Sequence, residues 1–543
     1  MKIYNLKTAA LGACILFSSI SCTGDFEQYN NEYLGGPEQF NADFTQIVNP
    51  LKLMQRNQQN PTNWIYQLQT NLNADMYSGL FSTATAYNGG RNNTTYYIMD
   101  GWNERVMMTQ LEDVFDKSKT INNVLKENYS KIDFSATLAI ASIMKIMAAS
   151  KVSDAHGPVV YSKFETPDPT TGITDFDSQE QAYNLFIQDL TKAIADLQKT
   201  PGAEDKSVVS KSDLIYGGDL AKWAKLANSL KLRFALRMSY ADATKSKKYA
   251  EEALSSSAGL IDDNSANALV SYGGASPIYD IIVAWGDCKI GAPLMSYMNG
   301  FKDPRISSYA KPATDKSVAG QYIGVRQGVD LGGSKDRYGD FSIPTAVSAA
   351  GDYFSNSDGK NKLFTASETW FLKAEAALRG YSGAGDAKTN YNKGIETSFG
   401  EWGKSNAYAT YVEDATSTQA PYIDPKNATN NITVGNPMLS TVTIKWNDGD
   451  SFERKLERIM TQKWIAIYPD GSEAWAEQRR TGYPILFKNI LNDSQGTIST
   501  SAMIRRLPIP NKYRNNTLNY PQALQFLGGA DTGGTKLWWD KKL

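Results

Sequence analysis

Apolar residues recur with helical spacing in eight segments of the chain. In each segment they stand three or four positions apart, which gathers them on one face of an α-helix. The segments are residues 107–128 and 134–150, 178–198 and 219–240, 364–380 and 386–400, and 452–467 and 471–480. This pattern predicts a mostly α fold built from four successive helix pairs.

The third pair shows how such helices could pack. Its first helix contains "ETWFLKAEAALRGY" and ends at Gly380, a residue typical of helix C-termini. Its second helix carries Ala387, Tyr391, Gly394 and Ile395 on one face. Small residues facing large ones are typical of tetratricopeptide repeats, so we expect tetratricopeptide-like packing with long insertions between the pairs.

Two long insertions have a different character. Residues 255–362 and 403–450 are rich in Gly, Ser, Asn, Asp and Tyr and contain few long periodic runs. We expect loops and short strands there, forming a loop-rich capping region. Loops on a rigid scaffold commonly carry binding residues.

The segment 219–240 combines a buried stripe with cations. Asp219 is a suitable N-cap, and Tyr216 stands where it could pack back onto the helix. The stripe consists of Leu220, Trp223, Ala227, Leu230, Phe234 and Met238, and Lys222, Lys225, Arg233 and Arg237 lie on a neighbouring arc. We therefore predict a scaffold helix whose cations extend from the packed face to solvent.

The amino-acid composition disfavours several classes of function. The chain has 56 Lys and Arg against 57 Asp and Glu, so no overall field attracts nucleic acid. Of three cysteines, Cys14 and Cys22 lie near the N-terminus, and only Cys288 is left for the fold. One histidine, His156, would have to serve every imidazole role, which disfavours a histidine metal centre or a Ser-His-Asp triad.

The N-terminus has the pattern of an export signal. Lys2 and Lys7 precede "TAALGACILFSSIS", and Cys22 follows. This resembles the lipobox of bacterial lipoproteins, with residues 1–21 as signal peptide and Cys22 as the acylated anchor. "LGAC" ending at Cys14 is a stricter match but leaves an apolar core of only about six residues.

The remaining chain is expected to form one domain behind a tether. Residues 22–45 are polar and lack strong periodicity, and residues 46–543 form a single domain. The apolar stretch from Phe134 to Ser150 contains Lys145 and is short for a membrane span, so it is predicted to be a buried helix.

Four motifs together resemble the SusD/RagB family of outer-membrane lipoproteins. They are "DLIYGGDLAKWAKLANSLKLRFALR", "SDAHGPVVYSKF", "ERIMTQKWIAIYPDGSEAWAEQRRTGYP" and "GGADTGGTKLWWDKK". Each is weak alone, but their order and spacing behind a lipobox-like signal are specific, and the resemblance covers nearly the whole mature chain.

The resemblance implies both architecture and role. Members of the family are mostly helical, with four tetratricopeptide-like helix pairs and a loop-rich region. They lie on the outer face of the outer membrane as the lid of a SusC-like TonB-dependent transporter, to which they deliver a nutrient, most often an oligosaccharide. No covalent chemistry is attributed to them. Asp25 and Glu27, just after Cys22, resemble acidic signals that send some lipoproteins to the cell surface.

Candidate ligand contacts are aromatic residues in irregular, polar sequence, where stacking and hydrogen bonding suit sugar rings. The two segments are "NNTTYYIMDGWNER" and "ASPIYDIIVAWGDCK". Together they supply Tyr96, Tyr97, Trp102, Arg105, Tyr279 and Trp285. We expect no catalytic residues, no metal ligands and no cofactor, although calcium in a loop stays open.

Other conspicuous residues are interpreted as structural. Arg479 and Arg480 should end a helix and pair with its acids or carbonyls before a Gly-Tyr-Pro turn. His156 should be a hydrogen-bonded structural imidazole, and "WWD" at 538–540 should be packed structure.

Three alternatives to a glycan-binding lipoprotein remain open. The first is a member of the same family that captures peptides or another nutrient. The second is a surface glycoside hydrolase, for which the sequence fixes no pair of carboxylates at a suitable separation. The third is a helical-repeat assembly protein without a small ligand.

Overall fold

The computed structural model describes residues 43–516 and 518–542. The predicted signal peptide and the proposed anchor Cys22 lie outside these residues. The first described helix, α4, begins at Thr45, close to the predicted end of the tether.

Helices dominate both halves of the chain. The first half contains α4 (Thr45–Arg56), α5 (Asn63–Tyr66), the π-helix η1 (Gln67–Asp75), α6 (Asp100–Gln110), the π-helical turn η4 (Leu111–Phe115), α7 (Asp116–Asn128), α8 (Ser135–His156), α9 (Gln179–Leu197), α10 (Ala203–Ser212), α11 (Leu220–Arg237) and α12 (Ala243–Leu254). The second half contains α13 (Pro277–Val283), α14 (Ala292–Gly300), α15 (Ile306–Tyr309), α16 (Ala366–Leu378), α17 (Ala387–Glu401), α18 (Tyr408–Val412), α19 (Phe452–Ala466), α20 (Gly471–Thr481), α21 (Asn511–Arg514) and α22 (Tyr520–Leu527). The mostly α fold is therefore confirmed.

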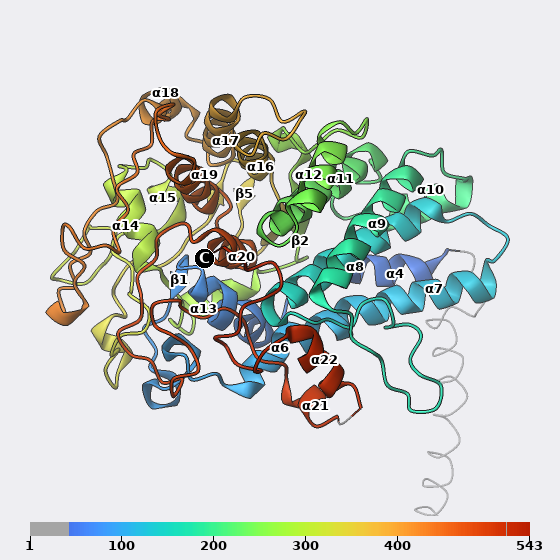
Figure 1. The fold of residues 1–543 in the computed structure, drawn as a ribbon, viewed down its shortest axis with the longest axis horizontal. Helices are drawn as coiled ribbons and strands as arrows, with labels where there is room; N and C mark the ends of the chain where they lie inside the picture. Colours follow the sequence, from blue (N-terminus) through green and yellow to red (C-terminus); the bar gives the residue numbers. More distant parts are fainter. Residues whose placement is uncertain (1–42, 517, 543) are drawn as a thin grey trace, which may run out of the picture.

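Strands are short and belong to the loop-rich part. Three antiparallel two-stranded sheets pair β1 (Phe81–Ser82) with β3 (Lys289–Ile290), β2 (Ala268–Ser271) with β6 (Lys360–Phe364), and β4 (Val347–Ser348) with β5 (Gly351–Asp352). In Figure 1, α4 and α7–α12 lie side by side at the right, and α14, α15 and long connections occupy the left. The β1–β3 pair matters for the site, because it joins the region after η1 to the region after α13.

The predicted helices exist, but two of the four predicted pairs are not the main contacts of their helices: α7 packs mainly on α4, and α19 contacts α16 more extensively than α20. The most extensive helix contacts join α4 with α7, α8 with α9, α9 with α11, α11 with α12, and α16 with α17. The sequence pattern predicts that the helices at 107–128 and 134–150 form a pair, whereas α7 packs mainly on α4. The buried residues Ile47, Leu51 and Met54 of α4 supply the apolar face that covers α7.

The predicted packing of α16 on α17 is confirmed in detail. A Cβ atom added to Gly394 would lie only 2.8 Å from Cζ of Phe371, so the two helices approach where a glycine faces a large ring. Within the described residues, α8 alone is long and apolar enough to cross a membrane, and most of it is buried among other helices. The stretch from Phe134 to Ser150 is therefore a core element, as predicted.

The local predictions for α11 are confirmed. The side chain of Asp219 accepts a hydrogen bond from the backbone N–H of Lys222 at 3.1 Å, and Tyr216 packs edge-on against Trp223 with ring centroids 5.4 Å apart. Trp223, Leu230 and Phe234 are buried in the core. The helix is scaffold rather than a ligand-gripping surface.

The prediction for its cations needs a correction. Arg233 and Arg237 do not reach solvent, and the side chain of Arg237 is fully buried. Lys225 does reach the surface, where it lies 3.8 Å from Asp262. The apolar arc alone could not show that acidic residues from distant helices would meet the two arginines inside the core.

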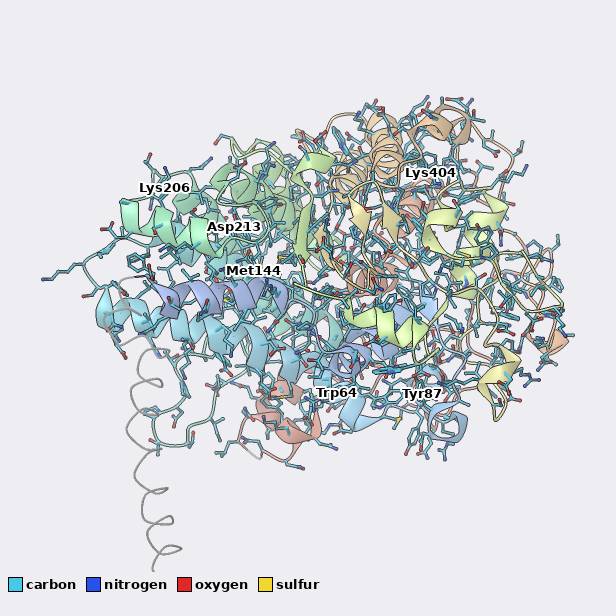
Figure 2. All side chains as sticks on the ribbon, turned by 180° about the vertical axis from the view of Figure 1, so that it is seen from behind. Trp64, Tyr87, Met144, Lys206, Asp213 and Lys404 are labelled. Carbon is cyan, nitrogen blue, oxygen red and sulfur yellow. The ribbon has the colours of Figure 1, made fainter. Side chains whose placement is uncertain are left out.

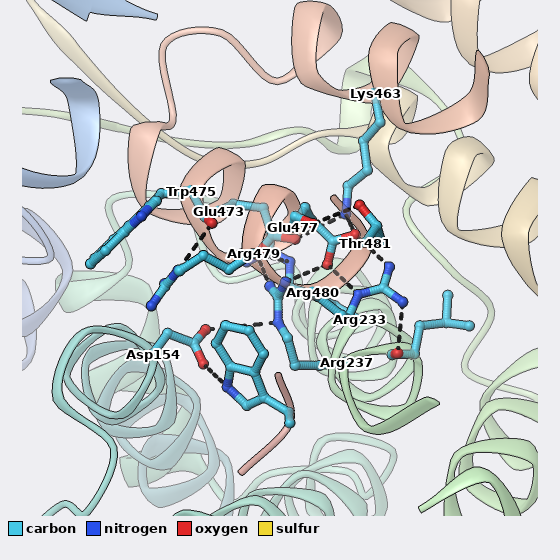
Figure 3. Close-up of polar contacts among 12 residues, drawn as sticks. Asp154, Arg233, Arg237, Lys463, Glu473, Trp475, Glu477, Arg479, Arg480 and Thr481 are labelled. Carbon is cyan, nitrogen blue, oxygen red and sulfur yellow. Dashed lines mark hydrogen bonds and ion pairs between the residues drawn. The ribbon is translucent and has the colours of Figure 1, made fainter. Parts of the chain in front are cut away.

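These arginines belong to a buried ionic cluster between α11, α16, α19 and α20. Figure 3 shows Arg233, Arg237, Lys463, Glu473, Glu477 and Arg480 of this cluster. Its members are the cations Arg233, Arg237, Lys463 and Arg480 and the carboxylates Glu368, Glu375, Glu473 and Glu477. Arg237 binds Glu473 at 2.5 Å and also binds Glu477, and Arg480 binds Glu375 at 2.6 Å. Charges of opposite sign are thus paired within the core.

Candidate ligand-binding site

Four segments contribute partly exposed aromatic side chains near the candidate site. Trp64 lies on α5, Trp102 on α6, and Trp285 just after α13. Tyr87 begins the short 3₁₀-helix η2 (Tyr87–Gly90). Figure 2 labels Trp64 and Tyr87 along the lower side of the molecule. We call Trp64, Tyr87, Tyr97, Trp102 and Trp285 the aromatic face.

One ring contact joins two members of this surface, and an arginine lies over each of two others. Tyr87 and Trp102 meet edge to face with centroids 5.3 Å apart. The guanidinium of Arg105, one turn further along α6, lies 5.1 Å from the ring centroid of Trp64. Tyr97 is flanked in the same way by Arg91 at 4.8 Å. Such cation–π contacts hold exposed rings in defined orientations.

The exposure of these rings leaves surface for a ligand. Trp64 is 46% exposed and Tyr97 is 38% exposed, while Trp102 and Trp285 are half-buried. Tyr279 is half-buried on α13. A half-buried ring is anchored on one side and open on the other, which is the condition for stacking against a sugar.

Tyr96 does not fit the prediction. Its side chain is 2% exposed and packs in a small core cluster with Tyr77, Trp475 and Ile504. Its backbone has a φ of 65°, which turns the chain so that Tyr96 points inward while its neighbour Tyr97 reaches the surface. The ring supports the loop from below and offers no face to a ligand.

Two members of the aromatic face were missed by sequence reasoning. Trp64 lies in "NPTNW" and Tyr87 in "AYNGG", and both are aromatic residues next to turn-forming sequence. The same pattern, an aromatic residue in irregular sequence, led to Trp102. The sequence therefore contains a signal for Trp64 and Tyr87 as well.

Polar groups join the segments around the aromatic face. Asn63 Nδ2 donates to Asp280 Oδ2 at 2.9 Å, which joins α5 to α13. Gln67 Nε2 donates to the Tyr87 hydroxyl at 3.0 Å. Lys335 Nζ forms an ion pair with Asp287 at 2.5 Å and donates to the carbonyl oxygen of Trp285 at 2.8 Å. Tyr87 contacts Trp102 with its ring and shares Gln67 Nε2 with Asp287, so the 96–105 and 279–287 segments lie near each other.

The residues interpreted as structural behave as predicted. His156 Nδ1 lies 2.9 Å from the carbonyl oxygen of Pro508, Arg480 pairs with Glu375 and Glu477, and Arg479 donates to the carbonyl oxygens of Trp475 and Arg505. Trp539 and Asp540 are fully buried. These groups belong to the frame.

His156 makes stability depend on pH. Burial lowers its pKa to about 3, and nearby Arg506 acts in the same direction. The unfolded chain takes up a proton near the ordinary pKa of about 6.5, whereas the folded protein does not, so stability falls as pH decreases below that value. From pH 7.5 to pH 5 the contribution of His156 should fall by about 2 kcal/mol.

The His156→Gln variant measures this contribution, because it removes the single histidine of the chain. We expect the urea unfolding free energy of the variant to lose about 2 kcal/mol less than that of the wild type between pH 7.5 and pH 5. Other titrating groups, including Asp75, whose pKa burial raises to about 8, contribute to both proteins and cancel. Equal losses in the two proteins would contradict the assignment.

No group of three or more His, Cys, Asp or Glu side chains within residues 43–516 and 518–542 is arranged to hold a metal ion. The expectation that the protein works without a cofactor stays a prediction. What the aromatic face supplies is stacking surface, with hydrogen-bonding groups around its rim.

Comparison with known proteins defines the family. A family model described as SusD-like, SusD and RagB outer membrane lipoprotein, matches residues 28–540. The chain therefore belongs to the SusD/RagB family of outer-membrane lipoproteins. A comparison with curated protein sequences finds no significant match.

Solved structures show the same fold. A chitin-binding SusD homologue from Flavobacterium johnsoniae is 35% identical, with a TM-score of 0.81 over 91% of this chain and 98% of that chain. A SusD homologue from Bacteroides vulgatus is 34% identical, with a TM-score of 0.82 over 92% of this chain and 98% of that chain. The fold is shared across the full length of both relatives.

Proposed function

We propose that this protein binds a glycan at the surface of the outer membrane and delivers it to a SusC-like TonB-dependent transporter. Cys22 would be the acylated residue that anchors the protein to the membrane, and the protein would face the exterior. Membership of the SusD/RagB family supports this role. In this proposal the protein acts by binding and carries out no covalent step.

The observation that carries the proposal is the aromatic face. Trp64 and Tyr97 offer exposed rings beside the half-buried Trp102 and Trp285, on loops and short helices above the scaffold. Flat rings of this kind stack on the apolar faces of pyranose units, and amide and guanidinium groups nearby can bind hydroxyl or acetamido groups. Beside these rings, Arg105 supplies a guanidinium over Trp64 and Asn63 supplies an amide.

The ligand class that we favour is a glycan containing N-acetylglucosamine. The support is the chitin-binding relative, which covers 91% of this chain at 35% identity. An acetamido group adds an apolar methyl group and an amide to each sugar unit, and both suit a surface of aromatic rings with polar neighbours.

Isothermal titration calorimetry against a panel tests the proposal. The panel should contain chitin oligosaccharides, maltooligosaccharides, other oligosaccharides and peptides, and each mixture should be analysed for products after long incubation. We expect binding of an oligosaccharide without product release. Binding of peptides alone would favour the peptide-capturing alternative, released sugars would favour a hydrolase, and no binding would reject the proposed function.

A further inference from the structure

One carboxylate on the site surface is contacted from three other segments. Asp287, which follows α13 and is largely buried, accepts a hydrogen bond from Thr85 Oγ1 at 2.6 Å. Lys335, in the 3₁₀-helix η7 (Lys335–Arg337), reaches it at 2.5 Å. Gln67 Nε2 of η1 lies 3.4 Å from its other oxygen. Segments far apart in sequence therefore converge on a single side chain.

The same carboxylate is linked to the ring system of the aromatic face. The Tyr87 hydroxyl and the Asp287 carboxylate share a donor, because Gln67 Nε2 lies 3.0 Å from the hydroxyl and 3.4 Å from Asp287 Oδ2. The Tyr87 ring in turn meets Trp102 edge to face at 5.3 Å. Asp287 is thus linked through Gln67 to the hydroxyl end of Tyr87, and the Tyr87 ring packs against Trp102.

Lys335 links the same carboxylate to Trp285. Lys335 Nζ bridges the Asp287 carboxylate and the carbonyl oxygen of Trp285, so the charge pair also fixes the backbone that carries the Trp285 ring. Lys335 is about half exposed, and its partner is largely buried. A charge-assisted hydrogen bond to a buried carboxylate is stronger than one between neutral groups.

Asp287 stays ionised at neutral pH. Burial raises the pKa of its carboxyl, but hydrogen bonds from Lys335, Thr85 and Tyr87 outweigh burial and hold the pKa below its ordinary value. The carboxylate is therefore able to accept from all of these donors at once.

We propose that Asp287 is the positioning residue of the aromatic face, which sets the places of Tyr87, Trp102 and Trp285 before a ligand arrives. This inference rests on the proposed function, because it assigns a role within the same site. Its physical basis is preorganisation: rings that are already ordered lose little conformational freedom when a ligand binds. Asp287 itself need not touch the ligand.

Two variants test the proposal from opposite sides of the charge pair. Asp287→Asn keeps the shape of the side chain and removes its charge, and Lys335→Met removes the cation from a half-exposed position without opening the core. We expect each variant to bind the best oligosaccharide of the calorimetric panel about tenfold more weakly than the wild type. Asp336→Asn is the matched control, because this neighbouring acid contacts Ser334 and not Asp287.

A double-mutant cycle separates positioning from general stabilisation. Asp287→Asn, Tyr87→Phe and the double variant should show coupled losses in affinity, because Asp287 acts through the Tyr87 hydroxyl. Their melting temperatures should stay close to that of the wild type. Additive losses in affinity would show that Asp287 does not act through Tyr87, and the proposal would be overturned.

Amide hydrogen exchange supplies a readout that needs no ligand. In Asp287→Asn, we expect faster exchange in peptides that cover residues 83–90 and 283–289, with unchanged exchange in α9 and α11. If the wild type binds no member of the panel, the proposed function fails while the exchange data still decide the role of Asp287. Unchanged exchange in both peptides, or an affinity of Asp287→Asn within twofold of the wild type, would contradict the role.

Discussion

Replacement of Arg237 by methionine should lower the free energy of unfolding by about 3 to 5 kcal/mol. The arginine is fully buried and binds Glu473 and Glu477, and its guanidinium lies 5.6 Å from the ring centroid of Trp539. The methionine would leave two buried carboxylates short of one cation. The cost arises mainly from these uncompensated charges rather than from the lost attraction itself.

The charge state of the carboxylates explains why the arginine matters. Burial raises the pKa of Glu473, but Arg237, Lys463 and Arg233 outweigh it and lower the pKa to about 2. The pKa of Glu477 is likewise held well below its ordinary value by Arg480, Lys463 and Arg237. Both side chains are therefore charged at neutral pH, and both need their cations.

Urea unfolding at neutral pH measures the effect. Lys225→Met, on the same helix, is the control, because its surface ion pair with Asp262 is worth at most about 1 kcal/mol. Arg237→Met combined with Glu473→Gln should recover part of the loss, since the second change removes one of the unpaired charges. A loss below about 1 kcal/mol for Arg237→Met would contradict a role for this cluster in holding α11 against α20.

The ionic cluster limits which cations of α11 could contact a transporter. Arg233 and Arg237 are paired inside the core, so they are not available to a partner protein. Of the cations on α11, Lys222 and Lys225 reach the surface. The basic character of this stretch in the sequence therefore belongs largely to internal packing.

Local features of the helices could be predicted from the sequence because their causes are local. The predicted segment 178–198 corresponds to α9 at Gln179–Leu197, and the Asp219 cap forms as expected. Helical periodicity and capping depend on residues a few positions apart, which a single sequence displays directly.

Long-range partners could not be predicted in the same way. Arg233 pairs with Glu368, which is 135 positions away, and Arg237 pairs with Glu477, which is 240 positions away. Many acids in the chain could have taken these places, and helix periodicity does not choose among them. The first helix pair failed for the same reason, because α4 rather than α8 supplies the main surface against α7.

The candidate site could be predicted in part from the sequence. Irregular, aromatic sequence led to Tyr97, Trp102 and Trp285, and the structure brings their segments together through Tyr87 and Asp287. Tyr96 differs from Tyr97 only in the direction in which the backbone turns its side chain. Neither that turn nor the convergence on Asp287 leaves a motif in the sequence.

Removal of the indole rings of Trp64 and Trp102 should weaken ligand binding more than any other change at the aromatic face. We expect Trp64→Ala and Trp102→Ala each to lower oligosaccharide affinity by about 2 kcal/mol, which is roughly thirtyfold, and the double variant to bind at least a hundredfold more weakly. Trp64 is the most exposed ring of the set, so its loss should leave stability nearly unchanged.

Calorimetry with the wild-type ligand measures these losses, and Trp370→Ala provides the control. Trp370, on the scaffold helix α16, is also incompletely buried, with Lys373 4.1 Å from its ring centroid, but it lies outside the aromatic face. Its replacement should leave affinity unchanged. If Trp64→Ala and Trp102→Ala bind as tightly as the wild type while the wild type does bind a glycan, the ligand must bind on another surface. Because Arg105 flanks Trp64 from α6, the helix that also carries Trp102, the double variant should lose less affinity than the sum of the two single losses if the rings act as one platform.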